Sequence, residues 1–369
     1  MTRNKEVLLM ISPTPPERFR GVARFAHEHN WFVTIEDRAT PPEDWVGDGV
    51  LVTLGTHHQA LFKAVRRYRR RGIPVVDLTN ARPEIALPRV RGDNDAIAQF
   101  AAEHLKAHGF TSAAWYSTNR GNVQTQRLVG FERHFGSKVA RLTGLPPEEL
   151  AERLAAFRKP LGVFTYSDYD ATKVLNACRR AGIGVPAEVA IVGVDDNKLL
   201  CENQCVPITS VRHDHERIGY EGAARLERIM DGTDTGPLEI LIPPLGIATR
   251  KSTDVFAATD PLVHAAYAVM SSEIGNRITV TGLAAALHVG VDTLETAFRR
   301  ETGHSVKREM MRMRLEKAVQ LLKTTDLKLE SVAIETGFCN AAHLSNELKA
   351  KTGRKASDFR SSVRYTAAG

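Results

Sequence analysis

The chain has 369 residues, a hydrophobic content of 43% and a formal net charge of +7. This length exceeds that of one ordinary domain, so we expect two or three domains with separate cores. The sequence contains no apolar run of eighteen residues, and its first apolar segment, residues 7–11, is too short for a secretory signal. We therefore expect no transmembrane helix, no signal peptide and a cytoplasmic protein.

The four cysteines are too few and too scattered for a disulfide framework. Cys201 and Cys205 have a spacing that could form half of a metal site, but no complementary ligand pair is evident in the sequence. We therefore expect reduced thiols, no metal and no cofactor.

From its N-terminus the chain alternates short apolar runs with segments of helical character. The expected strands of this first series are residues 7–11, 32–35, 49–54 and 73–78, and the expected helices are residues 19–29, a basic segment ending near residue 72, and residues 94–107. Continuous runs of Val, Ile and Leu between amphipathic helices favour parallel strands that are covered on both faces.

A second series of the same kind begins near residue 113. Its expected strands are residues 113–116, 161–165 and 189–194, and its expected helices end near Gly182 and Gly232. Two such series in tandem predict an α/β binding domain with two lobes.

The C-terminal region contains one pattern twice. Residues 294–303 read LETAFRRETG and residues 344–353 read LSNELKAKTG, and a short apolar helix signal precedes each copy. Helix, turn and second helix closed by Gly is the pattern of a helix-turn-helix unit. Apolar residues at helical spacing over residues 307–325 predict one helix that joins the two units. Such a connector could place two recognition helices roughly 34 Å apart, about one turn of DNA.

This C-terminal region resembles the DNA-binding domain of AraC/XylS-type transcription regulators. The resemblance is carried by RLEKAVQLL (314–322), VAIETGF (332–338) and the two TG endings. The region is also basic, because residues 260–369 contain 16 Lys and Arg against 12 Asp and Glu, a net charge of +4. We therefore expect an all-α domain with two helix-turn-helix units and double-stranded DNA as its partner.

The α/β region resembles the effector-binding domain of LacI/GalR regulators, and hence periplasmic sugar-binding proteins. The segments that carry this resemblance are IPVVDL (73–78), DNDAIAQFAAEHLKAHGF (93–110), QRLVGF (126–131), FTYSDYDATKVLNACRRAGIGVP (164–186), VAIVGVDD (189–196), ITSVRHDHERIGYEGA (208–223) and ATRKST (248–253). The two resemblances divide the chain into a two-lobed, periplasmic-binding-protein-like sensor domain (1–252), a linker (253–262) and a DNA-binding domain (263–369).

The combined resemblance implies a sugar-responsive transcription regulator. It favours xylose as effector, activation of a sugar-catabolism operon through RNA polymerase, and a homodimer, with no membrane partner. Three alternatives stay open at this point: another sugar or small molecule as effector, a repressor in place of an activator, and an enzyme with an appended DNA-binding domain. The sequence does not name the sugar or the operator.

In two-lobed α/β binders the ligand lies beyond the carboxyl ends of the strands, and a sugar requires carboxylates, amides and Arg as hydrogen-bonding partners. The residues that the resemblance implies for this role are Asp168, Asp195, Arg127, Ser167, Thr79 and Asn80. The aromatic candidates for stacking on a sugar ring are Phe19, Trp115, Tyr116 and Tyr166, although each is individually more typical of a core.

Other polar residues near the strand ends have simpler interpretations. Carboxylates after strands are often helix N-caps, and we expect this role for Asp93, Asp170 and Asp196. No carboxylate or Ser/Cys nucleophile signature accompanies the histidine pairs, so they are expected to be surface and cap residues. These pairs are His57 with His58 and His213 with His215.

For DNA, the recognition helices are expected at about residues 291–300 and 340–349. The residues expected to face base edges are Asp292, Thr293, Glu295 and Thr296 in the first helix and Asn340, Ala341, His343, Ser345 and Asn346 in the second. The residues expected to contact phosphate are Arg299, Arg300, Lys349, Lys351 and Arg354. Because the two acids of the first helix would repel phosphate, we expect base reading to depend mainly on the second unit.

Overall fold

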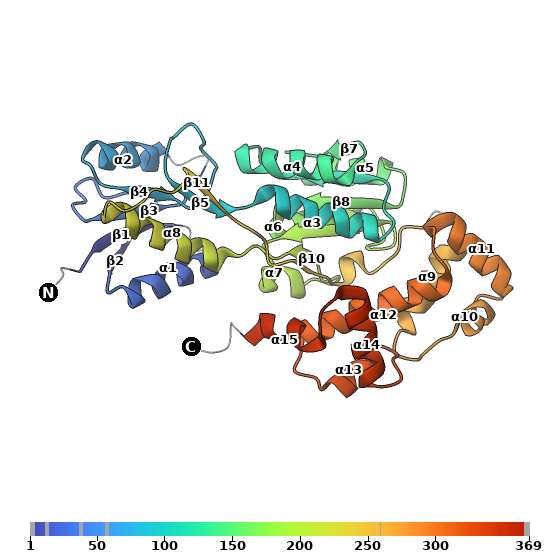
Figure 1. Ribbon diagram of the computed structural model, residues 1–369. Coiled ribbons are helices and arrows are strands. Elements are labelled where there is room, and N and C mark those ends of the chain that lie inside the picture. Colours follow the sequence, from blue (N-terminus) through green and yellow to red (C-terminus); the bar gives the residue numbers. More distant parts are fainter. Residues whose placement is uncertain (1–3, 12–14, 37–39, 56–58, 259, 365–369) are drawn as a thin grey trace.

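The computed structural model describes residues 4–11, 15–36, 40–55, 59–258 and 260–364. Two α/β lobes lie side by side, and a helical domain lies beside the second lobe (Figure 1). This arrangement confirms the predicted fold class. No helix in the described ranges is long and apolar enough to cross a membrane.

The first lobe is built on a six-stranded parallel sheet in the order β11-β5-β4-β3-β1-β2. Its strands are β1 (Glu6–Met10), β2 (Phe32–Ile35), β3 (Gly49–Val52), β4 (Val75–Asp77), β5 (Arg89–Gly92) and β11 (Glu239–Ile242). Helices α1 (Pro16–Glu28) and α8 (His215–Met230) cover one face, and α2 (Gln59–Arg70) covers the other. Because helices cover both faces of the sheet, its central strands are continuous apolar runs and do not alternate apolar with polar residues.

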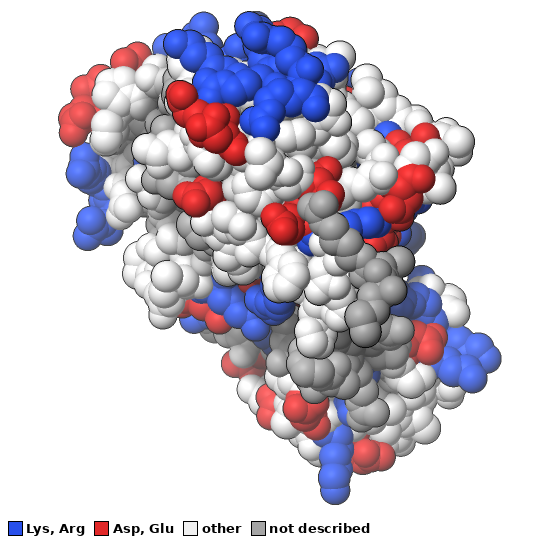
Figure 2. Space-filling model, turned by 90° about the vertical axis from the view of Figure 1, so that its left-hand side faces the viewer, with Lys and Arg blue, Asp and Glu red and all other residues white. Residues whose placement is uncertain are grey.

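The basic segment expected before residue 72 is helix α2. Its apolar side packs in the first-lobe core, while Lys63, Arg66, Arg69 and Arg70 point to solvent. Figure 2 shows a dense group of Lys and Arg at this end of the molecule, which Figure 1 places away from the helical domain. The positive charge of the chain is therefore not confined to its C-terminal region.

The second lobe has a six-stranded sheet in the order β12-β10-β9-β8-β6-β7, in which only β12 is antiparallel. Its strands are β6 (Ala113–Tyr116), β7 (Val139–Arg141), β8 (Leu161–Thr165), β9 (Val189–Val194), β10 (Thr209–Val211) and β12 (Ile247–Ala248). Its helices are α3 (Asn94–Ala107) and α4 (Asn122–Phe135) on one face, α5 (Pro147–Ala156) and α6 (Asp168–Arg180) on the other, and the short α7 (Lys198–Glu202).

The two lobes do not correspond to the two halves of the α/β sequence. In the described part of the chain, connections pass between the lobes after β5, after β10 and after β11. Helix α3, from the first sequence series, packs in the second lobe, whereas α8 and β11 return to the first. The simple tandem expectation was wrong in this respect, because strand pairing between distant segments decides lobe membership.

The helical domain contains both predicted helix-turn-helix units. Its helices are α9 (Pro261–Ser272), α10 (Val280–Ala286), α11 (Val291–Thr302), α12 (Val306–Thr324), α13 (Leu329–Glu335), α14 (Ala341–Thr352) and α15 (Ala356–Arg364). Helix α12 is the predicted connector, and its apolar residues take part in the cores of both units.

The repeated TG endings have the same structure in both units. Gly303 and Gly353 adopt left-handed conformations with φ of 72° and 69°, which end helices α11 and α14. The preceding threonines donate equivalent hydrogen bonds, Thr302 Oγ1 to the Phe298 carbonyl at 2.8 Å and Thr352 Oγ1 to the Leu348 carbonyl at 2.7 Å. The repeated Thr-Gly sequence therefore ends α11 and α14 in the same way.

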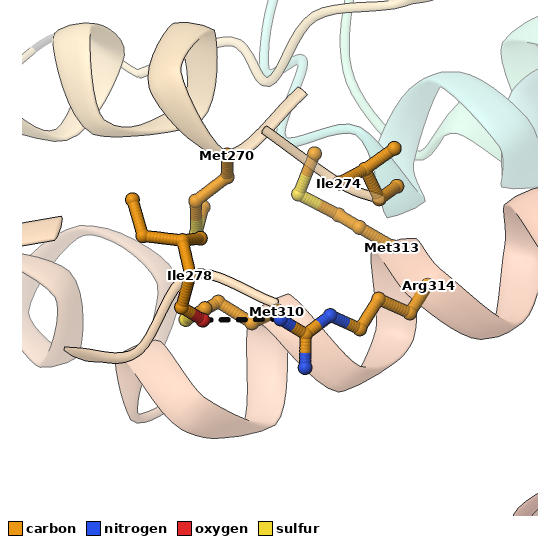
Figure 3. Close-up of a pocket in the computed structure, with 6 residues that line it drawn as sticks. All are labelled: Met270, Ile274, Ile278, Met310, Met313 and Arg314. Atoms are coloured by element: carbon orange, nitrogen blue, oxygen red, sulfur yellow. Dashed lines mark hydrogen bonds between the residues drawn. The ribbon is translucent and has the colours of Figure 1, made fainter. Parts of the chain in front are cut away.

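Two arginines join the helix-turn-helix units to each other. Arg314 of α12 donates from Nη2 to the Ile278 carbonyl at 3.0 Å (Figure 3), and Arg277 donates from Nη2 to the Phe338 carbonyl at 3.1 Å. The cavity in Figure 3 has a volume of about 10 Å³, room for at most one water molecule. Its lining residues are Met270, Ile274, Ile278, Met310, Met313 and Arg314. This cavity belongs to a packed seam and cannot hold a sugar.

Several residues between the second lobe and the helical domain are buried at their junction, among them Phe256, Ala257 and Ala258. Residues Lys251–Thr253 form a 3₁₀ turn on the second lobe, and Ala257 donates its N–H to the His108 carbonyl at 2.7 Å. The Phe256 ring stacks on Tyr267 of α9, with centroids 4.2 Å apart. The linker therefore contributes side chains to both cores: Val255 and Ala257 pack in the second lobe, and Phe256 and Ala258 pack in the helical domain.

Candidate effector cleft and DNA-binding surface

The polar residues that follow several strands meet between the two lobes. Asp195 directly follows β9 in the second lobe, and Asn80 lies beyond β4 in the first. Asn122, at the start of α4, donates from Nδ2 to the Asn80 carbonyl at 2.6 Å and so joins the lobes across this region. The carboxyl ends of the two sheets thus approach each other here, which is the position where open α/β sheets bind ligands, and we call this region the candidate cleft.

Asp195 is the carboxylate at the centre of this cleft. Its Oδ1 atom accepts hydrogen bonds from His215 Nε2 at 3.0 Å and His213 Nδ1 at 3.4 Å, and its side chain remains 28% exposed. Burial alone would raise the pKa of Asp195, but the hydrogen bonds from the two histidines and the charge of Arg127 outweigh it. The pKa therefore lies well below its usual range, and the carboxylate is ionised at neutral pH.

The backbone at Asp195 is unusual for a residue with a side chain. Asp195 and Asp196 have positive φ angles of 106° and 57°. Consecutive non-glycine residues in this region store conformational energy, which often marks a functional turn. The turn directs the Asp195 carboxylate toward the two histidines.

The histidine pair lies inside the cleft, which corrects the expectation of surface residues. Burial lowers the pKa of His213 to about 3 and also lowers the pKa of His215, so both rings are neutral at pH 7. Only Asp214 is a cap, accepting from the Arg217 N–H at 3.1 Å. Residues His57 and His58 lie outside the described residues.

The tautomer of His215 follows from its two partners. Arg18 Nη2 lies 3.0 Å from His215 Nδ1, and a guanidinium can only donate, so Nδ1 accepts and Nε2 carries the proton. This proton is the one that Asp195 accepts. Asp195, His213 and His215 offer three ligand atoms within 4.8 Å of one another, but a protonated Nε2 beside two arginines is a poor ligand set for a cation.

Arg127 is buried in the second-lobe wall of the cleft with 4% of its surface exposed. Its Nε atom donates to Asn94 Oδ1 at 2.9 Å, and its Nη1 atom donates to the Tyr166 carbonyl. The guanidinium lies over the Tyr166 ring at 5.0 Å from its centroid. Of the aromatic candidates, Tyr166 is thus at the cleft, whereas Trp115 and Tyr116 are core residues and Phe19 packs against the first-lobe core.

Three buried polar atoms at the cleft have no hydrogen-bonding partner among the described residues: Arg18 Nε, Asn80 Oδ1 and His213 Nε2. Leaving a buried polar atom unpaired costs about 1–3 kcal/mol, so native structures rarely keep several together without a ligand or water. Gly92 makes room for His213, because a Cβ atom there would lie 1.8 Å from its Nε2 atom.

Asp168 lies behind the cleft wall, whereas Ser167 and Thr79 remain partly exposed. Asp168 is 1% exposed, and its two oxygens accept from Ser210 Oγ at 2.6 Å and the Asn197 N–H at 2.7 Å. Ser167 Oγ caps α6, and Thr79 Oγ1 lies 2.8 Å from an Asp77 oxygen. These contacts orient the loops that carry the cleft residues.

Two of the three expected caps have other roles. Asp93 does cap α3, accepting from the N–H groups of Asp95 and Ala96. Asp170 instead accepts from Thr118, and Asp196 pairs with Arg250 Nη2 at 2.6 Å. The caps of α6 and α7 are Ser167, three residues before Asp170, and Asn197, one residue after Asp196.

Sequence reasoning missed Arg18, His213 and His215 as cleft residues. Arg18 lies in the first turn of α1, just beyond the carboxyl end of β1, where the same strand-end rule would have found it. The histidines follow β10, and their role depends on α8 returning to the first lobe. No local pattern signals that return.

In the first helix-turn-helix unit, Leu294, Ala297 and Phe298 of α11 are buried. Asp292, Thr293 and Thr296 are exposed, and Glu295 is partly covered. Both arginines of α11 are paired with acids: Arg299 with Glu295 at 3.6 Å, and Arg300 with Asp260.

In the second unit, α14 buries Leu344 and Leu348 and exposes Asn346, Lys349 and Lys351. Ala341, His343 and Ser345 are partly exposed. Asn340 is the N-cap of α14, since its Oδ1 atom accepts from the His343 N–H at 2.8 Å. Arg354, beyond the helix, donates to the Asp358 carbonyl at 3.0 Å and lies over the Phe359 ring.

Comparison with known proteins agrees with this architecture. Residues 102–253 match a periplasmic binding protein-like domain, and residues 283–362 match a helix-turn-helix domain. The chain is 26% identical over 347 residues to the xylose operon regulatory protein of Escherichia coli (strain K12), which covers 86% of each chain. It is 25% identical over 291 residues to the protein of the same name from Haemophilus influenzae, which covers 74% of each chain.

A solved structure described as the xylose-binding transcription activator xylR is similar over the whole chain. The match has a TM-score of 0.62 and 22% identity, and it covers 98% of this chain and 99% of the other. The chain is therefore a DNA-binding transcription regulator and not an enzyme. Within that class it is similar over most of its length to the xylose operon regulatory proteins, and in this chain a periplasmic-binding-protein-like domain precedes a helix-turn-helix domain.

Proposed function

We propose that this regulator responds to a sugar bound between the two lobes of its sensor domain, with xylose as the first candidate. The observation that carries the proposal is the ionised Asp195 carboxylate between the lobes, with unpaired buried atoms on two residues near it, Arg18 and His213. Carboxylate, amide and guanidinium groups are suitable partners for sugar hydroxyls. The names of the xylose operon regulatory proteins supply xylose as the candidate.

The proposed contact residues are Asp195, Arg127 and Asn80, together with Arg18 and the two histidines. Asp168, Ser167 and Thr79 support these residues through their hydrogen bonds. An effector that fills the cleft would satisfy atoms from both lobes at once. It would therefore favour the closed arrangement of the lobes, which is a population shift between two conformations.

Helix α3 is the element that we propose couples the cleft to the DNA-binding domain. Its first residue, Asn94, accepts a hydrogen bond from Arg127. Near its other end, His104 Nε2 lies 2.8 Å from Thr253 Oγ1, and the His108 carbonyl accepts from Ala257. A small rotation of α3 on effector binding would thus move the linker directly.

We further propose that the protein acts in the cytoplasm as a homodimer and activates transcription with RNA polymerase. Each chain would present α11 and α14 to successive major grooves, with Lys349 and Lys351 near phosphate. Repression, or a different effector, is the second candidate within the same architecture.

Thermal melting against a panel of pentoses and hexoses tests the effector assignment. A ligand specific for the folded state stabilises it by about 2.7 kcal/mol at a hundred times its Kd. We expect xylose to raise the melting temperature and Asp195→Ala to abolish the shift. No shift with any sugar would reject a sugar effector, and a shift that survives Asp195→Ala would reject this cleft.

A further inference from the structure

We propose that the sensor domain holds duplex DNA on a second surface, at the end of the first lobe that lies away from the helical domain. Five exposed side chains of α2 and of the turn after it form this surface, which we call the distal basic surface: Lys63, Arg66, Arg69, Arg70 and Arg71. Figure 2 shows the dense group of Lys and Arg at this end of the molecule. The proposal adds a DNA contact to the regulator and does not depend on the identity of the effector.

The first observation is the concentration of positive charge. Residues 59–72 contain six Lys and Arg and no Asp or Glu, a net charge of +6 in a chain whose total is +7. Residues 260–369, which include both helix-turn-helix units, have a net charge of +4. A short segment of the sensor therefore carries more net positive charge than the whole DNA-binding domain.

The second observation is that acids do not neutralise this charge. In the described part of the chain, no carboxylate forms an ion pair with the distal basic surface. Glu43, beside α2, pairs instead with Arg67 at 3.4 Å. Glu84 pairs with Arg82, whose guanidinium lies over the Phe62 ring of α2. The acids that these contacts place near α2 are therefore occupied by arginines outside the surface.

The third observation is the spacing of the cations along α2. Lys63, Arg66 and Arg70 are three and four positions apart, so they form one row on the exposed side of the helix, where like charges repel. The negative end of the helix dipole stabilises cations in the last turn, such as Arg69 and Arg70, but it does not account for Lys63 and Arg66, which precede that turn. A polyanion with a phosphate near each side chain would convert this repulsion into attraction.

Duplex DNA fits the surface better than the other polyanions or a second copy of the chain. The aromatic side chains of α2, Phe62 and Tyr68, are buried, so α2 offers no ring on which an unpaired base could stack. A two-fold contact between two copies would place the same five cations against each other. Duplex DNA, by contrast, is the polyanion that the helix-turn-helix domain already brings to the protein.

The position of the distal basic surface determines which DNA it contacts. Figure 1 places α2 away from the helical domain that contains α11 and α14. The surface therefore holds a stretch of duplex other than the one that α11 and α14 read. Because phosphate contacts carry no sequence information, this stretch needs no operator sequence. Two contacts from one protein raise the overall affinity when the DNA can reach both surfaces at once.

Fluorescence anisotropy of the full chain with a long labelled duplex of arbitrary sequence tests the proposal at several salt concentrations. The decisive variant combines Lys63→Gln, Arg66→Gln and Arg70→Gln, which removes the row of charge and keeps side chains that favour a helix. We expect it to weaken binding at least tenfold at low salt. The salt slope should fall by about two to three, because each phosphate contact contributes about 0.9.

A matched control removes the same charge from the second lobe. It combines Lys138→Gln, Arg153→Gln and Arg179→Gln, which are one exposed lysine and two exposed arginines of that lobe. This control should change the affinity for DNA less than twofold. Both triple variants should keep the melting temperature of the parent chain and its thermal response to xylose, because none of the six residues lies in the candidate cleft.

The proposal is overturned if the α2 variant binds the duplex as the parent chain does. It is also overturned if the second-lobe control weakens binding equally, since net charge alone would then explain the effect. Poly-glutamate is the probe for an acidic protein partner. If the α2 variant lost poly-glutamate binding but kept its DNA binding, the surface would belong to an acidic protein segment and not to DNA.

Discussion

His215 Nε2 lies 3.0 Å from Asp195 Oδ1. His215 is the first residue of α8 in the first lobe, and Asp195 directly follows β9 of the second lobe, so this hydrogen bond joins the two lobes. The contact spans the cleft, and Arg18 fixes its polarity by donating to the other nitrogen of the ring. The proposed effector site and the contact between the lobes therefore share these atoms. Several consequences can be measured.

Replacing His215 by Ala should weaken effector binding. The change removes the donor that orients Asp195 and the acceptor that holds Arg18. Loss of a hydrogen bond to a charged group costs about 1.5–3 kcal/mol, so we expect a fall in affinity of roughly ten- to a hundredfold by calorimetry. The control is Asp214→Ala, which removes only the cap of α8, lowering stability by about 1 kcal/mol and leaving affinity unchanged. Equal affinities for the two variants would contradict a role of His215 in the cleft.

Asp168 should give the sensor a characteristic dependence of stability on pH. Burial and the charge of Asp195 raise the pKa of Asp168 to about 7, against about 3.9 in an unfolded chain. Between pH 5 and 7 the folded protein then holds one more proton than the unfolded chain, so the unfolding free energy falls as pH rises, by at most about 1.4 kcal/mol per pH unit.

Asp168→Asn cannot bind this proton, so the destabilisation it causes should be greatest at pH 5 and smaller at pH 7. Denaturant titrations of both proteins at pH 5, 6, 7 and 8 provide the comparison. A destabilisation that stays constant over this range would contradict the raised pKa. One that grows with pH would mean that Asp168 is ionised in the folded state.

Phe256→Ala should separate effector binding from the DNA-binding response. The Phe256 ring stacks on Tyr267 and packs against Gly109, where a Cβ atom would lie 2.6 Å from the ring. Truncating a buried Phe costs about 3–5 kcal/mol, and here the loss falls on the junction between the domains. We expect unchanged effector affinity but a smaller effect of effector on DNA binding, measured by fluorescence anisotropy. Phe32→Ala, at a ring that is 62% exposed, is the matched control.

Two residues of α14 should affect DNA binding in different ways. Lys351→Ala should weaken binding to all sequences and reduce the salt slope by about one, because a phosphate contact releases about one counterion. Asn346→Ala should instead reduce discrimination between operator variants, by about 1–3 kcal/mol at one base pair. Competition assays at several salt concentrations separate these effects. If Asn346→Ala weakened all sequences equally, Asn346 would not be a base-reading residue.

The sequence by itself determined the features that depend on local patterns. The doubled LETAFRRETG and LSNELKAKTG segments predicted two helix-turn-helix units, because helix periodicity and a glycine stop are properties of consecutive residues. Continuous apolar runs predicted buried parallel strands for the same reason. The resemblance to LacI/GalR regulators also named Asp195 and Asn80, and both follow strands whose ends meet between the lobes.

The tertiary structure alone decided which residues complete that cleft. Arg18, His213 and Asp195 are far apart in sequence, and they meet because α1 and α8 pack together in the first lobe while β9 ends in the second. It also decided that Asp168 lies behind the wall, since Ser210 and Asn197 occupy both of its oxygens. Such outcomes depend on pairing between distant segments and on competition for hydrogen bonds, which no local pattern encodes.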